Sequence, residues 1–176
     1  MIRCRQGFAE SIPTDRVTQM AASDEFAIPG AAQRPRHGFN LGCAHLPDDA
    51  FLEAVRSGNL PLESFHHADH LRLAWLYLHR LPWEAALQEI STNIRQFGLR
   101  HGKPHAFHET VTVAWVRLLS THTEKTFDEF LSVNEAKLKS NLLHRFWSPE
   151  LLNSPQARTS WVEPDLNPLP DDRISK

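Results

Sequence analysis

Apolar residues recur at steps of three and four along most of the chain after residue 46, which is the period of one face of an α-helix. The pattern predicts helices over 65–81, from 83 to about 97, from about 105 to 119, and from 127 to about 145. A shorter helix should follow Asp48 or Asp49 and stop at Gly58. The Ser-Pro pairs at 148–149 and 154–155 should each start one or two helical turns. No segment alternates like a strand, so we expect an all-α, single-domain bundle of four to six helices.

The two ends of the chain differ from this helical part. Residues 1–45 carry scattered proline and glycine without a sustained period, which predicts an irregular or flexible N-terminal arm before a helical bundle domain over 46–176. The C-terminal stretch EPDLNPLPDD is too rich in proline for a helix, and we expect an extended tail across the bundle. A length of 176 residues with 41% hydrophobic content suits one core.

Charge and composition exclude several classes of partner. The 19 basic and 21 acidic side chains give a net charge of -2, without the basic excess that nucleic-acid binding usually needs. No apolar run reaches the ~18 residues of a membrane span, and none follows the basic start as in a secretory signal. Cys4 and Cys43 form no CxxC pair. We expect a cytoplasmic protein that binds a small-molecule substrate or ligand, with no nucleic-acid or membrane partner, and we leave a homodimer open.

Histidines interrupt the apolar faces of two predicted helices. One face consists of His67, His70, Leu71, Ala74, Leu78 and Leu81, and the other of His105, His108, Thr112, Trp115 and Leu119. In an up-down-up arrangement these two helices share a direction, so their histidine ends can meet at one end of the bundle. We therefore predict His67, His70 and His108 as metal ligands. His66 could take the inward position of His67, because the pattern does not fix the rotation of the helix.

Three neutral imidazoles with an open position suit a divalent transition metal such as Zn, Fe or Cu. Glu109 lies about 100° around the helix from His108, so it could act as a catalytic general base or accept from a ligand histidine. Asp69 beside His70 has the same two options. Arg72 lies on another face and should reach water. This constellation favours a small metal-binding protein, a metal-dependent hydrolase or oxygenase that activates water or dioxygen on a small molecule.

Two other interpretations stay open. The protein could be a non-enzymatic helical module that binds a small ligand or a protein partner, with structural or pH-sensing histidines. It could also be a metal-free acid/base enzyme that uses His108 and Glu109. The chain contains no GxSxG, P-loop, dinucleotide-binding or HExxH motif that would decide between them.

Three blocks of sequence resemble a known group of proteins. They are FxHxxHLRLAW at 65–75, FHETVTVAW at 107–115 and SPxARxxWVxPDLxPLP at 154–170. They are similar to recurring blocks in a group of small, uncharacterised bacterial all-helical proteins, and they cover most of 60–170. The resemblance implies a shared fold and a bacterial origin. It implies no activity, so the site residues above rest on periodicity and chemistry.

Overall fold

The computed structural model describes residues 41–170, all of which belong to one compact unit. This part of the chain forms seven α-helices and two short 3-10 helices, and it contains no strand. The longer helices are α1 (Asp48–Ser57), α2 (His67–Leu78), α3 (Trp83–Arg100), α4 (Glu109–Ser120) and α5 (Phe127–Asn134). The short ones are η1 (Leu62–Ser64), η2 (Leu142–Arg145), α6 (Pro149–Leu152) and α7 (Pro155–Thr159). The predicted all-α class is confirmed.

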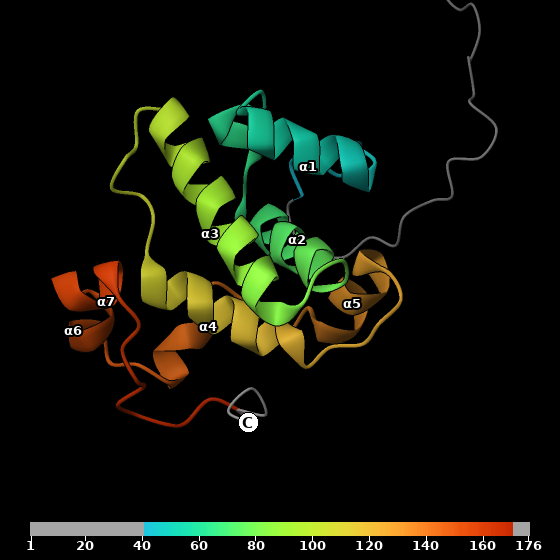
Figure 1. The fold of residues 1–176 in the computed structure, drawn as a ribbon. Coiled ribbons are helices and arrows are strands. Elements are labelled where there is room, and N and C mark those ends of the chain that lie inside the picture. The colour runs from blue at the N-terminus through green and yellow to red at the C-terminus, as the bar shows by residue number, and fades with distance from the viewer. Residues whose placement is uncertain (1–40, 171–176) are drawn as a thin grey trace, which may run out of the picture. The chain divides into compact units, whose positions relative to one another are not determined.

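Helix α2 is the centre of the bundle. It packs against α3, α4 and α5, while α1 packs against α3 and α7 against α4 (Figure 1). A helix that is apolar on all sides is stable only when neighbours cover all of them. Residues 71–76 of α2 are all buried, Arg72 among them, so neighbours cover every side of this stretch. The buried apolar residues of α2 are Ala68, Leu71, Leu73, Ala74, Trp75 and Leu76.

Glycines end two helices at backbone angles that favour a residue without Cβ. Gly58 closes α1 at φ 73°, as predicted, and Gly102 follows α3 at φ 68°. Helix α3 continues through Gly98 to Arg100, past the predicted end near residue 97. Gly98 keeps a helical backbone, so the chain breaks at Gly102.

Side-chain caps start three helices where the sequence predicts them. The hydroxyls of Thr126, Ser148 and Ser154 each accept a hydrogen bond from the backbone N–H three residues ahead. Such a cap contributes about 1 kcal/mol by satisfying a donor that has no partner inside the helix. The Ser-Pro pairs therefore start α6 and α7 as expected.

Helices α4 and α5 depart furthest from their predicted boundaries, and α2 is shorter at both ends than the predicted 65–81. Helix α4 begins at Glu109 and not near His105, because the ring of His108 caps it: Nδ1 accepts from the Val111 N–H at 3.3 Å. Helix α5 ends at Asn134 and does not continue to 145.

The side chain of Asn134 explains the early end of α5. Its Nδ2 donates to the Phe130 carbonyl and to Glu124 Oε1, both at 3.0 Å. This amide competes for backbone hydrogen bonds and ties the end of the helix to the preceding loop. Leu138 is nevertheless buried, from the turn that follows.

A buried carboxylate fastens residues 41–43 onto α2. Asp69 is fully buried, and its oxygens accept from the backbone N–H groups of Gly42 at 3.1 Å, Cys43 at 3.2 Å and His66 at 3.0 Å. Cys43 is also fully buried. Residues 41–45 of the predicted arm therefore belong to the packed body. The rest of that arm, residues 1–40, lies outside the described residues.

One turn further along α2, a buried arginine holds the next part of the same segment. Arg72 is 1% exposed, which corrects the prediction that it reaches water. Its guanidinium donates to the carbonyls of Cys43 at 3.0 Å and Leu46 at 2.7 Å, and it pairs with Asp48 at 2.5 Å. The segment before α1 is thus bound to the central helix through backbone groups.

The segment after α7 returns to α4 and to the residues that follow η2. Thr110 donates its hydroxyl to the Ser160 carbonyl at 2.8 Å and accepts from the Val162 N–H at 3.2 Å. The fully buried Trp147 donates its indole N–H to the Val162 carbonyl at 3.1 Å. Residues 163–170 form no helix. The extended course of the proline-rich tail stays a prediction, and residues 171–176 lie outside the described residues.

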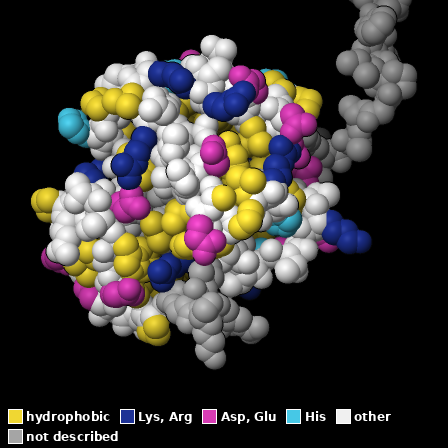
Figure 2. All heavy atoms as spheres, viewed as in Figure 1, with side chains coloured by type: hydrophobic (Ala, Val, Ile, Leu, Met, Phe, Trp, Pro, Cys, Tyr) yellow, Lys and Arg dark blue, Asp and Glu magenta, His cyan; other side chains and the backbone are white. Residues whose placement is uncertain are grey.

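The surface and the helix lengths bear on the predicted partners. On the face drawn in Figure 2, lysine and arginine side chains are interspersed with aspartate and glutamate, so this face has no extended area of one charge. Within residues 41–170, no helix combines the length and the hydropathy needed to cross a bilayer.

Candidate ligand-binding site

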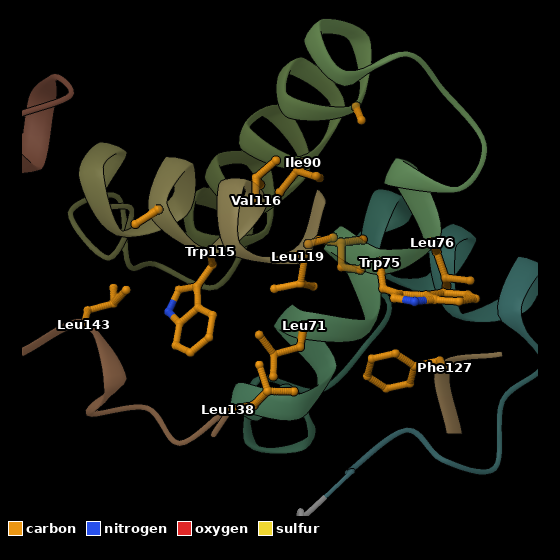
Figure 3. Close-up of a cluster of buried hydrophobic side chains, with 14 of the residues drawn as sticks. Leu71, Trp75, Leu76, Ile90, Trp115, Val116, Leu119, Phe127, Leu138 and Leu143 are labelled. Atoms are coloured by element: carbon orange, nitrogen blue, oxygen red, sulfur yellow. The ribbon is translucent and has the colours of Figure 1, made fainter. Parts of the chain in front are cut away.

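A cleft of about 340 Å³ lies between α2, α3 and α4 and is partly open to solvent. Its lining consists of His67, His70, Leu71 and Ala74 from α2, Ile90 and Ile94 from α3, and Val111, Thr112, Trp115 and Val116 from α4. In Figure 3, Ile90 and Val116 lie side by side with Leu71 below them. Pockets for small molecules usually measure about 300–1,000 Å³, so this cleft is large enough for a small ligand.

The helical period of the sequence predicts most of the residues that line the cleft. Four residues of the predicted inward face of α2 line the cleft, namely His67, His70, Leu71 and Ala74, whereas Leu78 and Leu81 of that face do not. Both imidazoles come from the first two turns of α2, three residues apart, and therefore lie on the same side of the helix.

His67 is held by a backbone carbonyl that lies 71 residues further along the chain. Its Nε2 lies 2.9 Å from the Leu138 oxygen, and because a carbonyl can only accept, Nε2 carries the proton. Its ring meets Trp115 edge to face at 4.9 Å between centroids. Burial lowers the pKa of His67 and outweighs the opposite effect of the Leu138 hydrogen bond. The imidazole is therefore neutral at neutral pH.

His70 is fixed by its own helix. Its Nδ1 lies 2.9 Å from the His66 carbonyl, one turn back, so Nδ1 carries the proton. Its ring packs over Phe65 at 4.1 Å between centroids. Burial lowers the pKa of His70, and neighbouring His67 lowers it further. In the neutral ring, Nε2 is a bare acceptor, and no group within residues 41–170 donates to it.

His66 does not line the cleft. It is the N-cap residue of α2, and its backbone N–H donates to Asp69. Of the two alternatives for the inward position, His67 is therefore the one that the fold selects.

His108 lies apart from the cleft. Its Nε2 donates to the Leu152 carbonyl of α6 at 2.8 Å, and its Nδ1 accepts from the Val111 N–H. Burial lowers the pKa of His108, which keeps Nδ1 available as an acceptor. Both ring nitrogens are thus engaged by the backbone, so this imidazole connects the start of α4 to α6.

The described structure does not assemble the three histidines into a metal centre. It brings His67 and His70 to one cleft and leaves His108 outside it. Within residues 41–170, no group of three or more His, Cys, Asp or Glu side chains is placed to hold a metal ion. The assignment of these histidines as ligands of Zn, Fe or Cu stays a prediction from the sequence.

The two candidate carboxylates also lie outside the cleft. Glu109 pairs with Arg95 at 2.5 Å, and the Arg95 guanidinium lies 4.0 Å from the Phe107 ring centroid. Asp69 uses its oxygens to hold the backbone of residues 42, 43 and 66. The catalytic role of Glu109 stays a prediction, and the contacts of Asp69 give it a structural role.

The two threonines at the start of α4 have different roles. Thr110 is engaged by residues 160 and 162, as described above. Thr112 is 9% exposed and lines the cleft, and no partner for its hydroxyl lies within residues 41–170. The helical period places Thr112 on the inner face, but only the position of the neighbouring helices shows that its hydroxyl meets a cavity.

A further hydrogen-bonded group was missed by the sequence analysis. His122 Nδ1 lies 3.3 Å from Glu124 Oε1, which also accepts from Asn134 Nδ2. The His122 ring meets Phe130 edge to face. Burial raises the pKa of Glu124, but hydrogen bonds from its own backbone, Asn134 and His122 outweigh it, so the net shift is downward. The group ties the α4–α5 loop to α5, and only the short spacing from His122 to Glu124 hints at it in the sequence.

No protein-family model, curated protein or solved structure matches this chain. The function is therefore argued from the geometry of the cleft itself.

Proposed function

We propose that the protein binds a small, largely apolar molecule in the α2–α3–α4 cleft. The observation that carries this proposal is the composition of the lining: seven of its ten residues are hydrophobic, and the other three are His67, His70 and Thr112. Apolar walls with a few polar groups are typical of small-molecule sites, because the walls supply affinity and the polar groups set the orientation. This function is the ligand-binding alternative considered from the sequence.

The state of the two histidines supports binding of a molecule without charge. Each imidazole donates one N–H to a backbone carbonyl and is kept neutral by burial. A neutral imidazole adds polarity to the cleft without the desolvation cost of a charge. The histidines thus fit a lining of an apolar site.

The proposal can be tested with a variant in which a larger side chain on α3 fills the cleft. Calorimetry then compares ligand binding by this variant, by a control variant and by the wild-type protein. Ile94→Trp places a larger side chain on a wall of the cleft, whereas Leu87→Trp makes the same kind of change two turns earlier, outside it. Both residues are partly buried and packed on the core, so they form a matched pair. With 1-methoxynaphthalene as the probe, wild type and Leu87→Trp should bind saturably, and Ile94→Trp should not. Equal binding by the two variants would refute the proposal.

A further inference from the structure

We infer that the ligand of the cleft is an uncharged molecule that donates a hydrogen bond, from a hydroxyl or an amide N–H, to Nε2 of His70. The inference rests on the proposed function, because it specifies the polar group of a ligand bound in that same cleft. It follows from the tautomer of His70, from the charges around the cleft, and from the hydroxyl that faces it.

The tautomer of His70 determines which hydrogen-bonding group of a ligand suits its Nε2. Nδ1 of His70 donates to the His66 carbonyl, so the remaining nitrogen of the neutral ring has a lone pair and no proton. No group within residues 41–170 donates to this Nε2, and the atom is accessible to solvent. A ligand that covers it binds more tightly when it supplies a donor, since a buried acceptor without a partner loses its hydration uncompensated.

The surroundings of His70 exclude a charged ligand at neutral pH. The titratable groups that influence it are His67 and Asp69, both on its own helix. Helices α3 and α4 contribute only apolar residues and Thr112 to the lining, with no lysine, arginine, aspartate or glutamate. A carboxylate in this cleft would lose water without meeting a cation, which is strongly unfavourable.

Thr112 favours a hydroxyl over other donors. Its side chain lines the same cleft from α4, opposite the histidines of α2, and a threonine hydroxyl can both donate and accept. A ligand hydroxyl that donates to His70 keeps its own oxygen lone pairs, and these can accept from Thr112. Alcohols and phenols therefore match both polar groups of the cleft.

Three naphthalene derivatives of similar size test the inference. 1-Naphthol has the donor, 1-methoxynaphthalene lacks it, and 1-naphthoate carries a negative charge. Near pH 8, calorimetry should give 1-naphthol a dissociation constant about 3- to 10-fold lower than that of 1-methoxynaphthalene, the usual effect of one net hydrogen bond. 1-Naphthoate should bind at least about 10-fold more weakly than 1-methoxynaphthalene, because its charge must be desolvated.

Two phenylalanine substitutions identify the acceptor. His70→Phe keeps an aromatic ring against Phe65 and removes Nε2, so the advantage of 1-naphthol should disappear while 1-methoxynaphthalene binds as before. His101→Phe is the matched control. Its ring also packs on a phenylalanine, Phe97, at 4.3 Å between centroids, but it lies outside the cleft. This variant should keep the wild-type preference.

Acidification should remove the preference for 1-naphthol over 1-methoxynaphthalene. Protonation of His70 turns Nε2 into a donor and puts a positive charge beside the ligand. Because burial lowers the pKa of His70, the change should come below the 6.5 of an ordinary imidazole. In that range the oxygens of 1-naphthol and 1-methoxynaphthalene can both accept from His70, so 1-naphthol should lose its advantage, and 1-naphthoate should bind more tightly.

The possible outcomes separate this inference from the proposed function. If the three probes bind equally well, or if His70→Phe leaves the preference for 1-naphthol intact, the assignment of the donor is wrong and the cleft remains a ligand site. If no probe binds saturably, the proposed function fails, and the inference fails with it. The comparison of probes on wild-type protein does not depend on the stability of any variant.

Discussion

The buried guanidinium of Arg72 provides the strongest test of how the bundle is held together. Replacing it by methionine keeps most of the apolar stem and removes every donor. Two backbone carbonyls, those of Cys43 and Leu46, lose their bonds to the guanidinium, and Asp48 loses its ion pair. The side chain of Asp48 is 48% exposed, so water can replace the arginine there.

The expected loss of stability comes mainly from the two carbonyls. The Cys43 carbonyl keeps the Leu46 N–H as a donor at 3.1 Å, and the Leu46 carbonyl is only partly buried, so neither is left as a sealed, unpaired acceptor. A hydrogen bond to a charged group contributes about 1.5–3 kcal/mol, so the two lost bonds cost about 3–6 kcal/mol. The half-exposed ion pair adds no more than about 1 kcal/mol, because water screens it. A domain of this size is usually stable by about 5–15 kcal/mol, so Arg72→Met should lose a large part of the free energy of unfolding.

Arg80→Met is the matched control, since the same change is made just beyond the end of α2. Arg80 pairs with Asp49 on the surface, where the two side chains are 41% and 89% exposed. Its loss should cost at most about 1 kcal/mol. Urea unfolding followed by circular dichroism should separate the midpoints of the two variants by on the order of 1 M or more. Equal midpoints would refute the claim that Arg72 anchors the segment before α1.

Two further predictions concern the histidines. Because burial lowers the pKa of His67, His70 and His108 below 6.5, the unfolded chain binds more protons than the folded one under mildly acidic conditions. The free energy of unfolding should therefore fall as the pH drops from about 8 to about 5, and His108→Gln should reduce that fall; a loss of the same size in the variant would contradict this. The metal assignment predicts stoichiometric Zn, Fe or Cu in the purified protein, lost in His108→Ala and retained in His122→Ala. Elemental analysis that finds equal metal contents in the two variants, or no metal after reconstitution, would refute that assignment.

The helical period predicts the inner face of α2 because packing and periodicity agree there. The same reasoning fails at Arg72, which a helical wheel places away from the apolar face of this helix. Such a wheel assumes that one side of the helix meets water. Residues 71–76 of α2 are instead all buried, so no side of the helix meets water around Arg72. The segment 41–48 that covers Arg72 carries no helical or strand pattern that would reveal its position.

His108 shows the same limit at the candidate site. The period places it at the head of an apolar helix face, whereas His108 is the N-cap residue of α4 and lies outside the cleft. The hydrogen-bond partner of its Nε2 is the Leu152 carbonyl, which is 44 residues further along the chain and lies 2.8 Å away in the folded protein. The sequence around His108 does not reveal this partner. His70, in contrast, finds its partner four residues away in its own helix, so its environment is largely local. Sequence reasoning locates a residue on a helix face more readily than it identifies the residue's partner.

The most direct test of the account is to locate a bound ligand by nuclear Overhauser effects. With 1-naphthol bound, ligand protons should show contacts to the methyl groups of Ile90, Ile94 and Val116, which line the cleft from α3 and α4. Ile94→Trp should abolish them. Ligand contacts to methyl groups outside the cleft, such as those of Leu151 on α6, with none to Ile90 or Val116, would contradict the account.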